Sequence, residues 1–234
     1  MRWFYMLKKG LCLFVGIMML FCQINVVHAT NLASGAESAV LIDAQSQQIL
    51  YQKNATKKLY PASTTKIMTM ILLFEAIQEK RLKWDDILTC SAYASSMGGS
   101  QIFLKVGEKM TVEDLLKGVA IASGNDAVVA LAERVSGSEE QFVKRMNIRA
   151  KDLGLKNTNF INATGLTADN HYSSAYDMSL IAKELVKHEK ILEFTSTYED
   201  YLRKDTKSPF WLVNTNRLVR FKEGVDGLKT GFTD

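Results

Sequence analysis

The sequence has little cysteine, proline and histidine. Among 234 residues there are 3 Cys, 2 Pro and 3 His. Cys12 and Cys22 lie in the apolar N-terminal stretch, which leaves Cys90 as the one thiol of the remaining chain. A single thiol excludes an intramolecular disulfide and a cysteine-cluster metal site there, and we interpret Cys90 as a small buried apolar residue. With 47% hydrophobic and 23% charged residues, the composition also excludes a disordered, collagen-like or low-complexity protein.

Acidic residues are absent from residues 1–29. This segment begins with basic residues, continues as an apolar run without a charge, and ends on the small residue Ala29. Such a pattern predicts a secretory signal peptide over residues 1–29, followed by one domain over residues 30–234. An uncleaved N-terminal membrane anchor is the alternative, because the apolar run approaches the length that spans a bilayer.

Basic and acidic residues nearly balance once residues 1–29 are removed. The 29 Lys and Arg residues become 26 against 25 Asp and Glu, so the formal net charge falls from +4 to +1. No basic patch with interleaved aromatic residues is found in the sequence. We therefore expect no nucleic-acid partner.

Helical periodicity and capping residues predict a largely helical middle of the chain. A buried helix begins near Ser63, in a run without glycine or proline that continues to residue 77. Capping signals predict the starts of three further helices, at Thr111, Ser138 and Ser174. The helix that follows Thr111 ends at the turn 123–125, and another helix begins directly after this turn.

Strand signals lie toward the two ends of the chain. Residues 38–53 read as a β-hairpin, and aromatic and β-branched residues predict strands over 194–201, 210–213 and 225–232. Strands, then helices, then strands, without regular βαβ alternation, predict an α+β fold. Its antiparallel sheet would be flanked by helices and closed by both ends of the chain.

Histidine offers little for catalysis. Residues 30–234 contain only His171 and His188, and they lack the G-x-S-x-G and H-E-x-x-H motifs. His188 lies among charged neighbours and reads as a solvated helix end. His171 lies in a polar loop, where a contact with a substrate stays open. A serine nucleophile in this chain would need a base other than histidine.

Ser63 and Lys66 supply such a pair. Three residues apart on a helix, their side chains share one face, and the helix N-terminus directs free N–H groups toward an oxyanion formed beside Ser63. A lysine titrates near about 10.4, so it accepts a proton only when it is desolvated or placed beside another cation. The sequence must therefore provide a second positive group.

Two further motifs complete a candidate site. Lys229-Thr230-Gly231 on an edge strand offers that second cation, with side chains that bind a carboxylate and a glycine that lets a substrate backbone approach. Ser123-Gly124-Asn125, on a turn between helices, offers a hydroxyl that relays a proton and an amide that holds a carbonyl. Each motif is weak alone, and their order along the chain gives the combination its strength.

These three motifs resemble the signatures of penicillin-binding proteins and serine β-lactamases. Their surroundings, at residues 60–69, 122–127 and 226–233, are similar to those of the low-molecular-mass D-alanyl-D-alanine carboxypeptidases, a resemblance that extends over residues 38–234 and is strongest for Gram-positive bacteria. It implies a transpeptidase-like fold in which helices flank an antiparallel sheet beside a mostly helical subdomain. It also implies an exported bacterial enzyme that acts at the extracytoplasmic face of the membrane or in the cell wall.

The resemblance implies a role for each matching residue. Ser63 would be the acylated nucleophile, Lys66 its general base, and Ser123 the residue that passes the proton to the leaving D-alanine. Substrate binding would fall to the residues Asn125, Lys229, Thr230, Gly231 and Phe232, with the N–H groups of Ser63 and Phe232 as the oxyanion hole. The implied substrate is a peptidoglycan stem peptide, β-lactams would acylate the same serine, and no metal or cofactor is required. Association of the full-length protein with a membrane surface is a further implication.

A class A β-lactamase is the nearest alternative enzyme. That family needs a glutamate in an E-x-x-x-N pattern after the middle motif, whereas residues 151–169 contain no glutamate. Rapid turnover of nitrocefin would favour the β-lactamase, and slow release of a trapped adduct would favour the carboxypeptidase.

The second alternative is a penicillin-binding fragment that is catalytically weak. Relatives continue well past the K-T-G motif, whereas this chain has three residues after Gly231. We expect further strands, a C-terminal helix, a β-rich domain and an amphipathic anchor to be missing, and we expect the 234-residue chain to be weakly active or inactive alone. A smaller departure is Ala163, where relatives often have proline.

Overall fold

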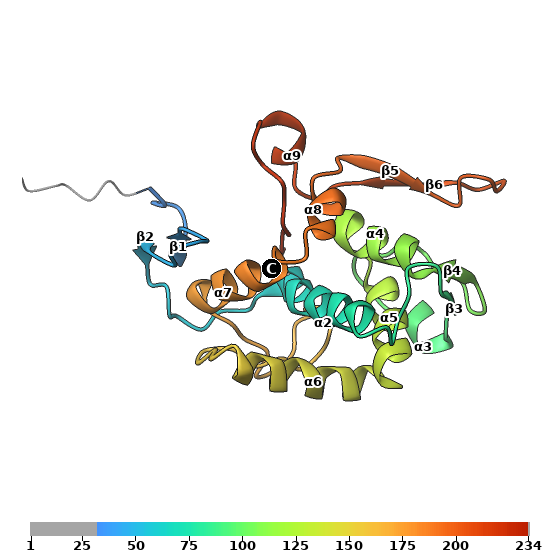
Figure 1. Ribbon diagram of the computed structural model, residues 1–234, viewed down its shortest axis with the longest axis horizontal. Coiled ribbons are helices and arrows are strands. Elements are labelled where there is room, and N and C mark those ends of the chain that lie inside the picture. The colour runs from blue at the N-terminus through green and yellow to red at the C-terminus, as the bar shows by residue number, and fades with distance from the viewer. Residues whose placement is uncertain (1–31, 234) are drawn as a thin grey trace, which may run out of the picture. The chain divides into compact units, whose positions relative to one another are not determined.

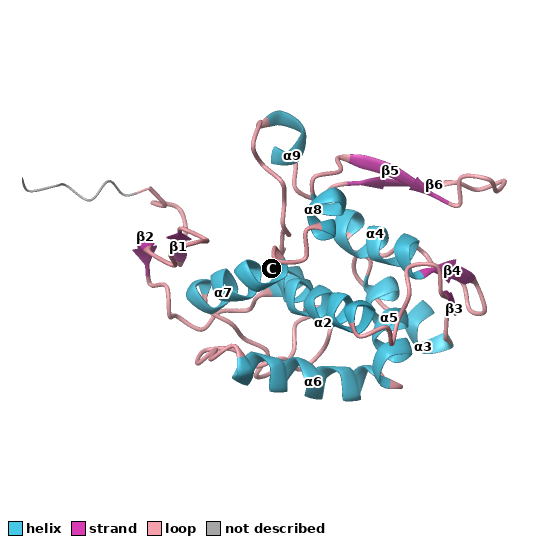
Figure 2. Ribbon diagram, viewed as in Figure 1, coloured by secondary structure: helices cyan, strands magenta, loops and turns pink. Residues whose placement is uncertain are grey.

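The computed structural model describes residues 32–233, and residues 35–233 belong to one compact unit. The predicted signal peptide lies outside the described residues. Within residues 32–233 no helix is both long and apolar enough to cross a membrane. Figures 1 and 2 show the helices and strands of this unit.

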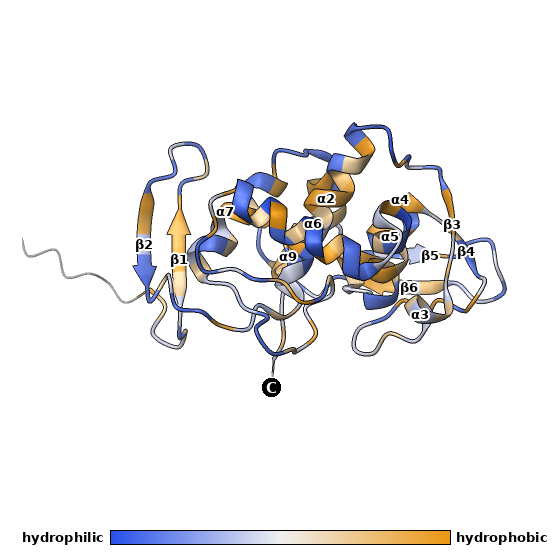
Figure 3. Ribbon diagram, turned by 90° about the horizontal axis from the view of Figure 1, so that it is seen from below, coloured by the Kyte–Doolittle hydropathy of each residue, from blue (hydrophilic) through white to orange (hydrophobic). Residues whose placement is uncertain are grey.

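Helix α2 (Lys66–Gln78) lies at the centre of the helical part. It is preceded by the 3-10 turn η1 (Ala62–Thr65), and ten of its 13 residues are buried. It contacts α5, α6 and α7, and Figure 3 shows how strongly apolar its residues are. The other helices are α3 (Ala92–Ser95), α4 (Val112–Ala122), α5 (Asn125–Ser136), α6 (Glu139–Asp152), α7 (Ala175–Leu185), α8 (Lys190–Thr195) and α9 (Leu218–Phe221).

The three predicted capping residues are confirmed. The hydroxyl groups of Thr111, Ser138 and Ser174 each accept a hydrogen bond from the backbone N–H three residues later, at 3.2 Å. These bonds satisfy N–H groups that an α-helix leaves without a partner. Helices α4, α6 and α7 therefore begin where the sequence predicts.

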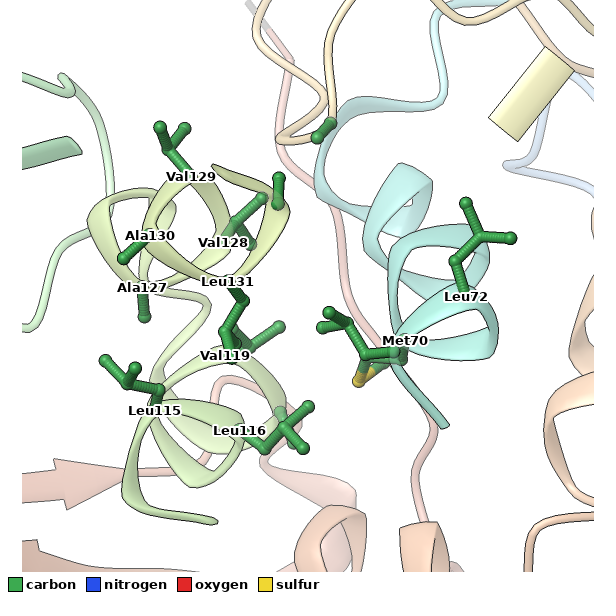
Figure 4. Close-up of a cluster of buried hydrophobic side chains, with 14 of the residues drawn as sticks. Met70, Leu72, Leu115, Leu116, Val119, Ala127, Val128, Val129, Ala130 and Leu131 are labelled. Carbon is green, nitrogen blue, oxygen red and sulfur yellow. The ribbon is translucent and has the colours of Figure 1, made fainter. Parts of the chain in front are cut away.

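The core fixes the turn between α4 and α5. Figure 4 shows Leu116 and Val119 of α4 and Leu131 of α5 directed toward Met70 of α2, and all four side chains are buried. Complete burial of such a side chain stabilises the fold by about 1.5–3 kcal/mol. The packing of α4, α5 and α2 around these side chains supports the 123–125 turn that joins α4 to α5.

The described strands form three two-stranded antiparallel sheets. The predicted hairpin at 38–53 is confirmed by the pairing of β1 with β2, and the strand at 210–213 is confirmed as β6. The pairs are β1 (Ala39–Ile42) with β2 (Ile49–Lys53), β3 (Ile87–Thr89) with β4 (Lys109–Thr111), and β5 (Glu199–Leu202) with β6 (Phe210–Val213). Helices and antiparallel pairs together agree with the predicted α+β class.

The strand predicted at 194–201 is wrong in part, and the strand predicted at 225–232 is wrong. Phe194 and Thr195 end helix α8, where the Thr195 hydroxyl bonds the carbonyl of Ile191 one turn earlier, and only Glu199–Leu202 is a strand. Residues 225–232 are not a strand, because no described strand pairs with them. The single sheet closed by both chain ends is therefore absent from residues 32–233, since a strand requires a hydrogen-bonded neighbour.

Candidate active site

Ser63 lies in a strained turn in front of α2. The sequence places it in the first turn of an α-helix, whereas the structure places it in η1, after Ala62 with its left-handed φ of 47°. Gly165 (φ 86°) packs against this turn so closely that a Cβ on it would lie 1.8 Å from the Ala62 carbonyl oxygen. Strain of this kind persists only where the surroundings impose it, as they often do at functional sites.

Lys66 is fully buried and directed at Ser63. Its Nζ donates to Ser63 Oγ at 2.9 Å and to the carbonyl oxygen of Thr164 at 2.7 Å. It makes no ion pair with any acidic residue of the described chain. Burial lowers the pKa of Lys66 well below its usual range, and the nearby Lys229 ammonium lowers it further. The amine is therefore suited to accept the Ser63 proton.

The loop that contains Thr164 is held from several sides. Asn162 Oδ1 accepts hydrogen bonds from the backbone N–H of Thr164 at 3.2 Å and of Gly165 at 2.7 Å. The N–H of Ala163 donates to Glu139 Oε1 at 2.9 Å. These contacts fix the Thr164 carbonyl, and through it the position of the Lys66 amine.

His171 is a structural neighbour of this region. His171 is 1% exposed, its Nε2 lies 2.8 Å from Thr65 Oγ1, and its Nδ1 accepts from the N–H of Ile161 at 3.2 Å. Burial lowers the pKa of His171 to about 4. Both ring nitrogens of His171 are therefore occupied by contacts inside the protein.

His188 is half-buried against Phe74, with ring centroids 5.3 Å apart, so the prediction of a solvated helix end is wrong.

The turn between α4 and α5 carries two unpartnered buried oxygens. Ser123 ends α4 with a left-handed φ of 65°, and its Oγ has no hydrogen-bond partner in the described chain. Asn125 Nδ2 donates to the Gly98 carbonyl at 2.7 Å, while its Oδ1 has no partner there. Buried polar atoms nearly always have partners, so these two unpartnered oxygens mark the turn as part of the candidate site.

Lys229, Thr230 and Gly231 lie beside the Ser63 turn. A Cβ on Gly231 would lie 3.1 Å from both the Pro61 carbonyl oxygen and the Ala62 Cβ. Burial lowers the pKa of Lys229 to about 8. The segment is an extended loop and not the predicted edge strand, and Phe232, which follows it, is 85% exposed.

Close contacts connect the three motifs. Gly99 lies between the middle motif and the Thr164 loop, because a Cβ on it would be 2.9 Å from Asn125 Nδ2 and 3.5 Å from Leu166 Cδ2. The N–H of Thr215 donates to the carbonyl of Ile121 in α4, while its hydroxyl contacts Lys229 and Thr230. The structure thus brings the predicted residues into one region. Among residues 32–233, no group of three or more His, Cys, Asp or Glu side chains is placed to hold a metal ion.

The family model of the D-alanyl-D-alanine carboxypeptidases matches residues 25–234. The chain belongs to this family.

Curated relatives of this carboxypeptidase-family chain are considerably longer. It is 58% identical over 227 residues to the D-alanyl-D-alanine carboxypeptidase DacF of Bacillus subtilis, covering 94% of the chain and 58% of DacF. It is 41% identical over 206 residues to DacC of Escherichia coli, covering 85% of the chain and 50% of DacC. The chain therefore spans between half and three-fifths of the length of these relatives.

Solved structures agree with the penicillin-binding fold that the motifs predict. The D-alanyl-D-alanine carboxypeptidase DacD of Francisella tularensis superposes with a TM-score of 0.82 and 28% identity, covering 89% of this chain and 62% of that chain. Penicillin-binding protein D2 of Listeria monocytogenes, in its cefotaxime-bound form, superposes with a TM-score of 0.75 and 33% identity, covering 85% and 80%. The predicted fold of the family is confirmed.

Three residues that shape the site lie outside the three motifs. Thr164 acts through its backbone carbonyl, which no side-chain motif reveals. Thr215 lies outside the three motifs, and only the fold brings its hydroxyl to Thr230. Asn162 lies in a segment that is similar to the family, but its loop-closing hydrogen bonds depend on the observed turn.

Proposed function

We propose that this chain carries the catalytic site of a serine-type D-alanyl-D-alanine carboxypeptidase. Such an enzyme removes the terminal D-alanine from a peptidoglycan stem peptide through an acyl-enzyme on Ser63. The fully buried Lys66 carries the proposal, because its amine donates to Ser63 Oγ and has a backbone carbonyl as its other partner. The names of the family and of the curated relatives support the same activity.

Acylation would begin with proton transfer from Ser63 Oγ to the neutral Lys66 amine. The serine oxygen then bonds to the carbonyl carbon of the scissile peptide. The backbone N–H groups of Ser63 and Phe232 would stabilise the oxyanion, since Gly231 packs directly against the turn that precedes Ser63. Collapse of the intermediate breaks the C–N bond, and water later releases the shortened peptide.

The remaining predicted residues would bind and protonate the substrate. The free Ser123 hydroxyl would pass a proton to the nitrogen of the leaving D-alanine. Asn125 would orient the peptide, with the Gly98 carbonyl fixing its amide. Lys229 and Thr230 would bind the terminal carboxylate beside Gly231, because a cation and a hydroxyl together satisfy its oxygens.

We also propose that β-lactams acylate Ser63 and that the protein acts outside the cytoplasm. Penicillin-binding protein D2 of Listeria monocytogenes has been solved in cefotaxime-bound and ampicillin-bound forms, which supports the first proposal. The predicted signal peptide over residues 1–29 supports the second. Mass analysis of the N-terminus of exported protein would test whether cleavage follows Ala29.

Acylation by benzylpenicillin provides the most direct test. We expect intact-protein mass spectrometry to show one covalent adduct, and peptide mapping to place it on Ser63. Ser63→Ala should abolish the adduct and Lys66→Met should slow its formation by at least about a hundredfold. Ser46→Ala, at an exposed serine of the first hairpin, is the matched control. A cooperatively folded chain that forms no adduct and releases no D-alanine from a D-alanyl-D-alanine peptide would overturn the proposal.

Nitrocefin turnover separates this function from that of a β-lactamase. The glutamate that contacts the Thr164 loop, Glu139, has both oxygens engaged: Oε1 accepts from the Ala163 N–H and Oε2 from the Tyr93 hydroxyl. Both oxygens of this carboxylate therefore hold the protein together, and the group is poorly placed to activate a water molecule. We expect the adduct to hydrolyse slowly.

A further inference from the structure

Thr215 contacts both carboxylate-binding residues of the proposed site. Its Oγ1 accepts a hydrogen bond from Thr230 Oγ1 at 2.7 Å and a longer one from Lys229 Nζ at 3.5 Å. The side chain is exposed, so these contacts are not a by-product of core packing. A threonine that joins two functional groups in this way can control how they are presented to a ligand.

The backbone around Thr215 is anchored on both sides. Its N–H donates to the Ile121 carbonyl at 3.2 Å, two residues before Ser123. The next residue, Asn216, donates from Nδ2 to the Gly227 carbonyl at 3.0 Å. The Thr215 hydroxyl is thus fixed relative to both the end of α4 and the Lys229 segment.

Hydroxyl chemistry allows this contact to change direction when a carboxylate binds. A threonine hydroxyl both donates and accepts, and its hydrogen rotates about the C–O bond without movement of heavy atoms. In the free protein Thr230 donates to Thr215. With a carboxylate present, Thr230 can donate to the ligand while Thr215 donates to Thr230, which keeps both hydroxyls satisfied and polarises the outer one.

We propose that Thr215 is a positioning residue that orients Thr230 and Lys229 for the free terminal carboxylate of the peptide. The inference rests on the proposed function for its substrate. It adds a residue outside the three motifs, and it assigns to that residue the preference for a free acid over a C-terminal amide.

The kinetic test compares two peptides that differ only at the C-terminus, a D-alanyl-D-alanine free acid and its amide. For Thr215→Val we expect KM for the free acid to rise about tenfold, with a smaller change in kcat and little change for the amide. Thr215→Ser, which keeps the hydroxyl, should restore the preference for the acid. Thr206→Val is the matched control, because the exposed Thr206 hydroxyl bonds only within its own turn: it donates to the Arg203 carbonyl and accepts from the Ser208 N–H.

A second measurement does not depend on catalysis. Methyl NMR of Thr230 should show one χ1 rotamer in the wild type and in Thr215→Ser, and rotamer averaging in Thr215→Val. If the wild type neither releases D-alanine nor reacts with benzylpenicillin, the proposed function fails, and the NMR result alone decides the role of Thr215. An unchanged Thr230 rotamer in Thr215→Val, or an unchanged preference for the acid, would overturn the inference.

Discussion

His171 Nε2 lies 2.8 Å from Thr65 Oγ1, directly before the lysine that contacts Ser63. Because Nδ1 accepts a hydrogen bond from the Ile161 N–H, Nε2 carries the proton of the neutral ring and donates it to Thr65. A second proton, bound at Nδ1, would remove the acceptor of the Ile161 N–H and place a positive charge in the protein interior. The turn in front of α2 is thereby coupled to the protonation state of a buried histidine.

Acid should therefore destabilise the protein through His171. Burial lowers the pKa of His171 from 6.5 to about 4. Between these two pH values the unfolded chain binds a proton that the folded chain does not bind. The free energy of unfolding therefore has its full value above pH 6.5 and decreases as the pH falls toward 4. The loss amounts to about 3 kcal/mol. Urea unfolding at pH 7 and pH 4.5 would measure it.

His171→Gln provides the comparison for this prediction. Glutamine keeps an amide donor and does not titrate, so the variant should lose stability at pH 7 but show a much shallower pH dependence. An equally steep dependence in His171→Gln would assign acid sensitivity to other groups.

Lys229 should set an alkaline limit on substrate capture. Its pKa is lowered to about 8 by burial, so the ammonium that binds a carboxylate is lost as the pH rises through 8. We expect kcat/KM for a D-alanyl-D-alanine peptide to fall above pH 8. In Lys229→Arg the charge persists at all accessible pH values, so the fall near pH 8 should disappear even if the maximum rate is lower. Persistence of the same alkaline limb would show that another group causes it.

Ser123→Ala should separate activity from stability. The Ser123 hydroxyl is buried without a partner, and removal of such a group costs little or stabilises the fold by up to about 1 kcal/mol. Alanine and serine also bear a similar cost at the left-handed φ of 65°. We expect release of D-alanine to slow at least about tenfold while the urea midpoint stays constant or rises. A large loss of stability would mean that the hydroxyl has a structural partner.

Gly165→Ala and Gly154→Ala form a matched pair. Both glycines have a left-handed backbone, with φ of 86° and 71°. A Cβ at Gly154 meets nothing within 4 Å, whereas a Cβ at Gly165 would lie 1.8 Å from the Ala62 carbonyl oxygen. Gly154→Ala should cost about 1 kcal/mol. Gly165→Ala should cost about 3 kcal/mol and abolish acylation, because the Ser63 turn must move. Equal costs in urea unfolding would contradict the observed clash.

Local signals in the sequence predict much of the fold. Thr111, Ser138 and Ser174 satisfy N–H groups within their own helices, so their roles do not depend on distant residues. Phe194 and Thr195 show the limit of such reasoning, because β-branched and aromatic residues pack in helix α8 once its buried face is available. The β3–β4 pair is missed for a related reason: its strands are three residues each and are far apart in the sequence.

The residues of the candidate site also differ in how far the sequence alone predicts their contacts. Ser63 and Lys66 are predictable because their contact requires only three residues of helical spacing, and it forms even though the first turn is a 3-10 turn. The desolvation of Lys66 and the proximity of Lys229 depend on the assembled core. No sequence motif points to Thr215, because it lies in a separate segment and only the fold places its hydroxyl beside Thr230.

The second partner of the Lys66 amine has a consequence for which substitutions the protein can tolerate. Because Thr164 supplies a main-chain carbonyl, side-chain replacement at that position leaves the contact chemically intact. The Thr164 side chain is buried and its hydroxyl donates to Asn162 Oδ1 at 3.1 Å, so it contributes to the loop and not to the lysine contact. At Gly165, by contrast, the size of the residue itself is restricted. Position 164 should accordingly accept other small side chains that fit its buried site, whereas position 165 should accept none, although the two positions are adjacent in the chain.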